Sequence, residues 1–126
     1  MGAVALTLPA AEPARIVIEP GDAGSFHRRL AERELLRGLT QLGLQPSIGP
    51  AGAGPSIALR VEPRRFKSTE ASEIAAEGKR ITLTGASDLA LVYAVFDFLE
   101  RQGAFFGMDA ESYPLEPVRQ LVLPPA

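Results

Sequence analysis

Apolar residues recur with a helical period in two segments of the chain. From His27 to about Leu42 the sequence is rich in Leu, Arg, Glu and Ala, and Leu35, Leu39 and Leu42 fall on one side of a helix. Gly43 follows, and glycine is favoured just beyond a helix C-terminus. Charged residues occupy the opposite side of this segment: Arg29, Glu32, Arg33 and Arg37. The pattern predicts an amphipathic helix with one buried face.

A second helix is predicted from Asp88 to about Gln102. Ser87 precedes it as an N-cap whose hydroxyl accepts from a first-turn amide, and Asp88 suits the positive end of the helix. Gly103 marks its end. Its apolar residues form a broad stripe: Leu89, Leu91, Val92, Val95, Phe96, Phe98 and Leu99. Its polar side carries Tyr93, Asp97, Glu100 and Arg101. Such a broad stripe predicts nearly full burial on one side.

Shorter segments alternate apolar and polar residues or are rich in β-branched residues, which predicts strands. These segments are Arg15–Glu19, Ser56–Glu62, Ala71–Ala76, Arg80–Thr84 and Ala104–Phe106. Residues 77–79 resemble a hairpin turn, so the two strands that flank them are expected to be antiparallel. Residues 46–55 hold prolines and glycines in quick succession, and we predict a loop there, neither helix nor central strand.

The length of 126 residues predicts a single domain, which we place at residues 14–124. Residues 1–13 are expected to form a disordered tail, either the native start or a remnant left where an export signal was replaced. Prolines predict that the C-terminal segment is extended and irregular, like a linker: Pro114, Pro117, Pro124 and Pro125.

Composition then excludes several classes of function. The formal net charge of -2 and the pI of about 5.4 give no basic field for phosphate backbones, which argues against a nucleic-acid partner. The sequence has no Cys, which removes disulfides and thiolate chemistry, and no Trp, which weakens a sugar-stacking platform. No apolar run approaches the ~20 residues of a membrane span, so no membrane partner is expected.

Candidate nucleophiles and phosphate loops are weak. His27 is the single histidine, so neither a metal triad nor a histidine relay can be assembled, and a surface or capping role is favoured. Ser87 follows a strand and precedes a helix, as a hydrolase nucleophile would, but no histidine lies downstream and a helix cap is preferred. The glycine-rich run 49–54 lacks the Lys-Ser/Thr of a phosphate loop and leads into a strand. We expect a connector there, and no metal or cofactor.

Two acidic pairs and one basic cluster remain as candidates. Asp97 with Glu100, and Asp109 with Glu111, could in principle supply an acid and a base for glycoside cleavage, but solvated side chains are the default interpretation. A possible contact site for an acidic sugar or a partner protein is a basic cluster with one aromatic residue, which a surface loop explains equally well. It consists of Arg64, Arg65, Phe66 and Lys67.

The run Arg80–Gly103 resembles the strand–helix signature of an accessory domain that precedes the catalytic barrel in several glycoside hydrolases. Its pattern is a strand "I-x-I-x-G-A-s" that enters a helix "G-x-x-Y-G-v-y-x-f-L-E-x-l-G", followed by an aromatic strand and a proline. The matching positions here are Tyr93, Phe96, Leu99, Glu100 and Gly103, then Phe105–Phe106 and Tyr113–Pro114. Ala90 and Ala94 depart from it, since they occupy glycine-like positions. The N-terminal domains of family 67 α-glucuronidases and family 20 β-N-acetylhexosaminidases are the most similar.

The resemblance spans roughly residues 15–124, with specific motifs only in the last third. It implies an α+β two-layer sandwich, a mixed sheet of four or five strands with two helices on one face. This is the β-N-acetylhexosaminidase-like fold, similar to a zincin core without its metal site. The catalytic acids of such enzymes lie on the barrel, so no catalytic residue transfers to this chain. Separately, Ala10–Ala14 resembles the first residues after a signal-peptide cleavage site, so a secreted or periplasmic location is expected.

Three functions follow from these features. The leading hypothesis is a non-catalytic accessory domain of a carbohydrate-active hydrolase that packs against a (β/α)8 barrel. Such a domain should expose an apolar patch when isolated and dimerise weakly through it. The rival is a free-standing module that binds a polysaccharide or a protein. The third is a small enzyme with an unrecognised carboxylate pair.

Overall fold

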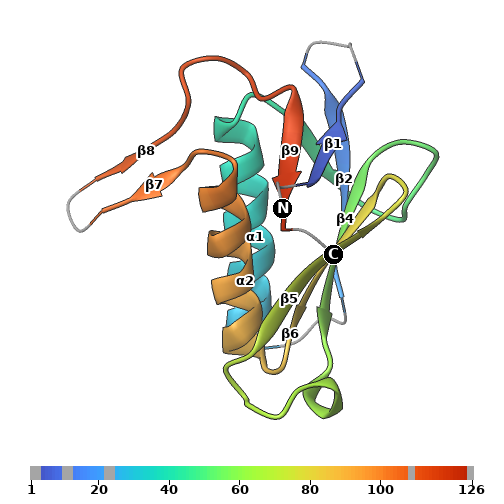
Figure 1. The fold of residues 1–126 in the computed structure, drawn as a ribbon, viewed down its shortest axis with the longest axis vertical. Helices are drawn as coiled ribbons and strands as arrows, with labels where there is room; N and C mark the ends of the chain where they lie inside the picture. The colour runs from blue at the N-terminus through green and yellow to red at the C-terminus, as the bar shows by residue number, and fades with distance from the viewer. Residues whose placement is uncertain (1–3, 10–12, 22–24, 108–109, 125–126) are drawn as a thin grey trace.

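A computed structural model describes residues 4–9, 13–21, 25–107 and 110–124. A five-stranded sheet in the order β3-β2-β4-β6-β5 forms one layer, and two helices packed side by side form the other (Figure 1). Strands β3, β2, β4 and β6 are parallel to their neighbours, and β5 is antiparallel to β6. The fold is therefore the α+β two-layer sandwich with a mixed sheet that the sequence predicts. Its elements are β2 Arg15–Glu19, α1 Phe26–Gln41, β3 Gln45–Ile48, β4 Ser56–Val61, β5 Ser72–Glu77, β6 Arg80–Gly85 and α2 Asp88–Arg101.

Both helices begin and end where their capping residues predict. The Ser25 hydroxyl accepts from the backbone N–H of Arg28, and the Ser87 hydroxyl accepts from that of Ala90, so each satisfies an amide of a first turn. Gly43 follows α1 with a φ of 88°, and a Cβ there would lie 2.7 Å from Pro117. Glycine is thus required at this cap by conformation and by space.

The core lies between the sheet and the helices. Side chains of Ile16, Ile57 and Leu83 point from the strands toward Leu35 and Phe98 on the helices, and all of them are buried. The helices approach closely at Gly38, where a Cβ would meet the Leu99 methyl groups at 2.5 Å. Neither helix is long and apolar enough to cross a membrane, in the part of the chain that the structure describes.

One predicted core position of α2 is wrong. The sequence pattern places Leu89 on the apolar stripe, but its side chain is 43% exposed. Leu89 lies four residues before Tyr93, so the two side chains share the outward side of the helix. Val92, Phe98 and Leu99 are buried as the pattern predicts. The broad stripe thus exceeds the width that the sheet and α1 can cover.

The predicted loop at residues 46–55 is also partly wrong, because Gln45–Ile48 forms the edge strand β3 beside β2. The backbone N–H of Gln45 donates to the carbonyl of Ala14, just before β2, and that of Gly49 donates to Ile18 within it. Residues alternate in direction along a strand, so the nitrogen of Pro46 lies on the side away from β2, where no hydrogen bond is needed. An edge position therefore tolerates a proline that a central strand would not.

The chain ends pair with each other rather than forming an irregular tail and linker. Strand β1 (Val4–Thr7) is antiparallel to β9 (Gln120–Leu123), and Leu121 and Leu123 are buried. The side chain of Gln102, itself buried, donates to the carbonyl of Val122 at 2.8 Å and accepts from its N–H at 2.7 Å. This amide ties β9 to the end of α2. The boundary predicted for the domain, residues 14–124, remains a prediction.

The predicted final strand forms β7 (Phe105–Phe106), but it lies outside the main sheet. It pairs with β8 (Glu111–Ser112) in a separate hairpin. The Phe106 ring contacts Phe96 of α2 at a centroid distance of 5.1 Å, and Arg37 of α1 binds Glu111 through both guanidinium ends. These contacts fix the hairpin to the helix layer.

Candidate functional site

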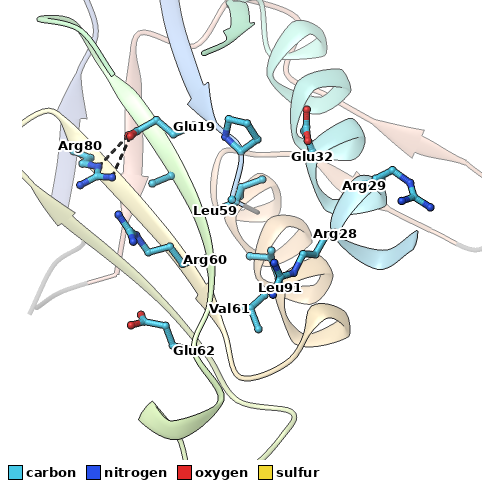
Figure 2. Close-up of a pocket in the computed structure, with 13 residues that line it drawn as sticks. Glu19, Arg28, Arg29, Glu32, Leu59, Arg60, Val61, Glu62, Arg80 and Leu91 are labelled. Atoms are coloured by element: carbon cyan, nitrogen blue, oxygen red, sulfur yellow. Dashed lines mark hydrogen bonds and ion pairs between the residues drawn. The ribbon is translucent and has the colours of Figure 1, made fainter. Parts of the chain in front are cut away.

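A cleft of about 360 Å³ lies at the carboxyl ends of β2 and β4, beside the first two turns of α1 (Figure 2). Glu19, Pro20 and Gly21 line it from the end of β2. Its remaining lining residues come from β4 and the residue after it, from the two helices and from β6: Ala58, Leu59, Arg60, Val61, Glu62, Arg28, Arg29, Glu32, Leu91 and Arg80. The cleft thus reaches from the face of the sheet opposite the helices, which we call the uncovered face, to the helix layer.

An ion pair holds two side chains in place where the cleft lies on the uncovered face of the sheet. The Arg80 guanidinium donates to both carboxylate oxygens of Glu19, at 3.0 and 3.1 Å. Ala58 lies on the strand between them, since its register partners are Glu19 on β2 and Thr82 on β6. A small side chain there lets the two long side chains meet across β4. The bidentate geometry holds both side chains in place but contributes little stability, because the Arg80 side chain is 42% exposed.

The helix side of the cleft is organised around Asp88. Its carboxylate accepts from Nε of Arg28 at 2.7 Å and from the Ser25 hydroxyl, and it sits in the first turn of α2. Hydrogen bonds from Ser25 and then from Arg28 lower the pKa of Asp88 below its usual value, with burial acting in the opposite direction. The contact joins the starts of the two helices and fixes Arg28 at the cleft.

Arg60 is the exposed cation on β4, on the uncovered face of the sheet. No ion pair or hydrogen bond of its guanidinium is found within the described residues, whereas Arg80 is bound to Glu19. The neighbouring Glu62 lies 3.6 Å from Arg65. Arg60 is therefore a cation of the cleft with donors available to a ligand.

The four residues of the predicted basic cluster lie next to this cleft in sequence but do not line it. Arg64 and Arg65 belong to the short 3-10 helix η1 (Pro63–Arg65), and Phe66 and Lys67 follow. Arg65 is bound to Glu73 at 2.6 Å, so part of the cluster's charge is neutralised. The structure brings Arg65 to Glu62 and Glu73 rather than to its cationic neighbours. Their role in ligand binding remains a prediction.

The other candidate residues occupy structural positions. The Ser87 hydroxyl caps α2 and donates to the carbonyl of Thr69 at 2.8 Å, so its proton is held in a structural bond. His27 lies in the first turn of α1, exposed, with its ring against Phe26. No cluster of three or more His, Cys, Asp or Glu suited to a metal ion occurs among the residues that the structure describes.

The acidic pairs do not form a two-carboxylate site. Asp97 pairs with Arg101 at 3.3 Å on the exposed side of α2, and Glu100 is exposed. Glu111 is bound to Arg37 and accepts from the hydroxyl of Tyr113 at 2.8 Å. Burial, and then the adjacent Glu111, raise the pKa of the Tyr113 hydroxyl. Asp109 lies outside the described residues.

The glycine-rich run 49–54 connects β3 to β4 and is exposed or half-buried.

Sequence reasoning missed the cleft, and the reason is geometric. Glu19 and Arg60 each stand near the end of a predicted strand, but the sequence does not show that these strands are parallel neighbours. Polar residues at strand ends were the available signal. Their significance depends on strand order, which local patterns do not contain.

No family model matches this sequence, and no curated protein matches it. Among solved structures, similar folds occur in a GH138 enzyme described as targeting pectin rhamnogalacturonan II and in the protein CpGH84D. The GH138 enzyme has a TM-score of 0.57 and 19% identity over 68% of this chain, which corresponds to 13% of that enzyme. CpGH84D has a TM-score of 0.55 and 12% identity over 73% of this chain, which corresponds to 17% of CpGH84D.

At these identities the likeness concerns the fold alone. The chain spans less than a fifth of either matched protein. The matches fall in families other than the two that the sequence motif resembles, so they do not bear out family 67 or family 20 as the specific relative. The fold of this chain is one that also occurs as a small part of large glycoside hydrolases.

Proposed function

We propose that this chain is a non-catalytic accessory domain of a larger glycoside hydrolase and that it packs against a (β/α)8 catalytic barrel. The observation that carries the proposal is the repeated match of its fold to a minor part of a long glycoside hydrolase chain. The motif from Arg80 to Gly103 supports the same class, and family 67 and family 20 stay the predicted relatives. Export from the cytoplasm accompanies this proposal.

A surface on the helix layer supports the packing. Leu89 and Tyr93 follow one another at helical spacing and are 43% and 57% exposed. Phe96 continues the same side, half-buried, and contacts Phe106 of the β7–β8 hairpin. We call these four residues the outer apolar stripe. An apolar surface of this kind is typical of a domain that contacts another domain.

The outer apolar stripe gives the proposal a test in the parent polypeptide. Replacing Leu89 and Tyr93 together by Ser is expected to lower the unfolding temperature of the barrel, because the barrel loses an apolar contact. The matched control replaces Arg33 and Gln41, exposed on α1, by Ser. Calorimetry of the three proteins measures the unfolding temperature of the barrel. Equal temperatures in all three would contradict the proposal that the barrel packs against this stripe.

The alternative function is a free-standing module that binds a carbohydrate or a protein. The cleft at the ends of β2 and β4 is the observation that favours it, because it is a concave surface with an available cation. Weak dimerisation of the isolated chain through the outer apolar stripe follows instead from the accessory-domain proposal, because the barrel that would cover the stripe is then missing. Light scattering across a concentration series tests that dimer, which the Leu89→Ser variant should weaken.

A further inference from the structure

The cleft lies between two neighbouring strands, β2 and β4, whose chain connections lead to opposite edges of the sheet. Strand β2 continues through α1 to β3 on one side of it, whereas β4 is its neighbour on the other side. Strand β4 in turn leads away from β2, toward β5 and β6. In open α/β sheets with helices on both faces, ligands bind in the crevice outside the carboxyl ends of strands whose connections diverge. Here both helices lie on one face, so the cleft has the strand order of such a site but not its second helix layer.

The backbone of β4 adds polar groups to the cleft. The pairing of β2 with β4 ends at Glu19 and Ala58, while β4 continues to Val61. Val17 donates to the carbonyl of Pro55, so the odd-numbered residues of this part of β4 direct their backbone groups toward β2. Beyond the end of β2, the backbone groups of Val61 consequently face the cleft with no described strand beside them. Such groups can donate to and accept from hydroxyls.

The charges of the cleft favour an anion. Four arginines and three glutamates line it, which gives a net charge of 4 − 3 = +1. Glu19 is bound by Arg80, and Glu62 lies near Arg65. Arg60 has no such partner in the described part of the chain. Glu32 lines the opposite, helix side, as Figure 2 shows. A guanidinium is planar and binds a carboxylate through two parallel hydrogen bonds.

We propose that this cleft binds a small hydroxylated carboxylic acid of the size of a sugar acid, with the carboxylate on Arg60. The hydroxyl groups contact the backbone groups of Val61, on the edge of β4 that faces no strand among the described residues. The volume of about 360 Å³ lies within the range of small-molecule sites, roughly 300–1,000 Å³. The Glu19–Arg80 pair forms a fixed part of the cleft wall, on the same face of the sheet as Arg60. This site goes beyond the proposed accessory role and does not depend on a barrel.

The test is a titration of the isolated chain with sodium glucuronate, followed by calorimetry and by NMR shifts of Arg60 and Val61. Glucose at the same ionic strength is the neutral control. We expect saturable binding of glucuronate and none of glucose. Arg60→Gln should weaken binding about tenfold or more, since it removes a charge-assisted hydrogen-bonded contact. Arg60→Lys should retain part of the affinity.

The matched control variant is Arg64→Gln, because Arg64 is exposed, lies four residues further along the chain and does not line the cleft. It should bind glucuronate like the parent sequence. Three results would overturn the proposal: no saturable binding of glucuronate, equal binding of glucose, or equal weakening by Arg60→Gln and Arg64→Gln. None of these results would affect the packing test in the parent polypeptide, so the two proposals fail separately.

Discussion

The cleft and the outer apolar stripe expose different kinds of group to solvent. In the cleft, charged side chains are held in pairs such as Glu19 with Arg80 and Arg28 with Asp88, and the surface is concave. Along the stripe, Leu89 and Tyr93 expose apolar area on the outward side of α2. Charge and concavity suit a small polar ligand, whereas an exposed apolar helix face suits another protein surface. One small fold therefore has two surfaces for which we propose separate uses.

The largest expected effect separates the core from the outer apolar stripe in the isolated domain. Phe98→Ala removes a fully buried ring on α2 and is expected to lower the free energy of unfolding by about 3–5 kcal/mol. Tyr93→Ala, on the exposed side of the same helix, should change it by less than about 0.5 kcal/mol. Urea denaturation measures both. A comparable loss from Tyr93→Ala would mean that the stripe belongs to the core.

The next largest effect concerns the pairing of the chain ends. Gln102→Leu leaves both backbone groups of Val122 without the side-chain amide that pairs with them, and should cost about 1–3 kcal/mol. Amide exchange at Val122 should accelerate in the same variant. Gln41→Leu, on an exposed glutamine, is the control. Unchanged exchange at Val122 would contradict the role assigned to Gln102.

A smaller effect depends on pH at the helix side of the cleft. The pKa of Asp88 is lowered in the folded protein, so its ionised form contributes stability above the unfolded pKa near 3.8. That contribution is lost as the pH falls through the folded pKa. Asp88→Asn should therefore cost less than about 1 kcal/mol at neutral pH and nothing at the acid end. Denaturation of both proteins across pH 2–7, roughly spanning that window, measures this. A difference that stays constant with pH would contradict it.

The smallest effect is expected at the ion pair on the uncovered sheet face. A double-mutant cycle with Glu19→Gln and Arg80→Gln should give a coupling below about 1 kcal/mol that decreases with added salt. The pair matters more for fixing the Arg80 side chain at the cleft wall than for stability. A large, salt-independent coupling would show that the cleft wall is a stabilising element instead.

Local patterns were sufficient for the helices and the central strands. Ser87, Gly43 and the spacing of Leu35 with Leu39 act within one or two turns, so their effect can be recognised from neighbouring residues. Strand β9 could not be recognised in this way, since its partner β1 lies at the other end of the chain and prolines surround it. The edge strand at Pro46 was missed because tolerance of proline depends on which side of the strand is unpaired.

The cleft required strand order as well as strand positions. In the sequence, Arg60 is one polar residue of an alternating strand. Its place in the lining of the cleft depends on β2 ending before Arg60 is reached, which only the strand order shows. The exposure of Leu89 likewise depends on how much of α2 the sheet and α1 cover. Both are properties of packing between distant segments.

Whether this chain is a domain of a larger glycoside hydrolase is tested by reading the source gene beyond the codon for Ala126. We expect an open frame of several hundred codons whose sequence alternates strand and helix patterns, as a (β/α)8 barrel requires. A stop codon directly after Ala126 would contradict it and leave the free-standing binding module as the function to test.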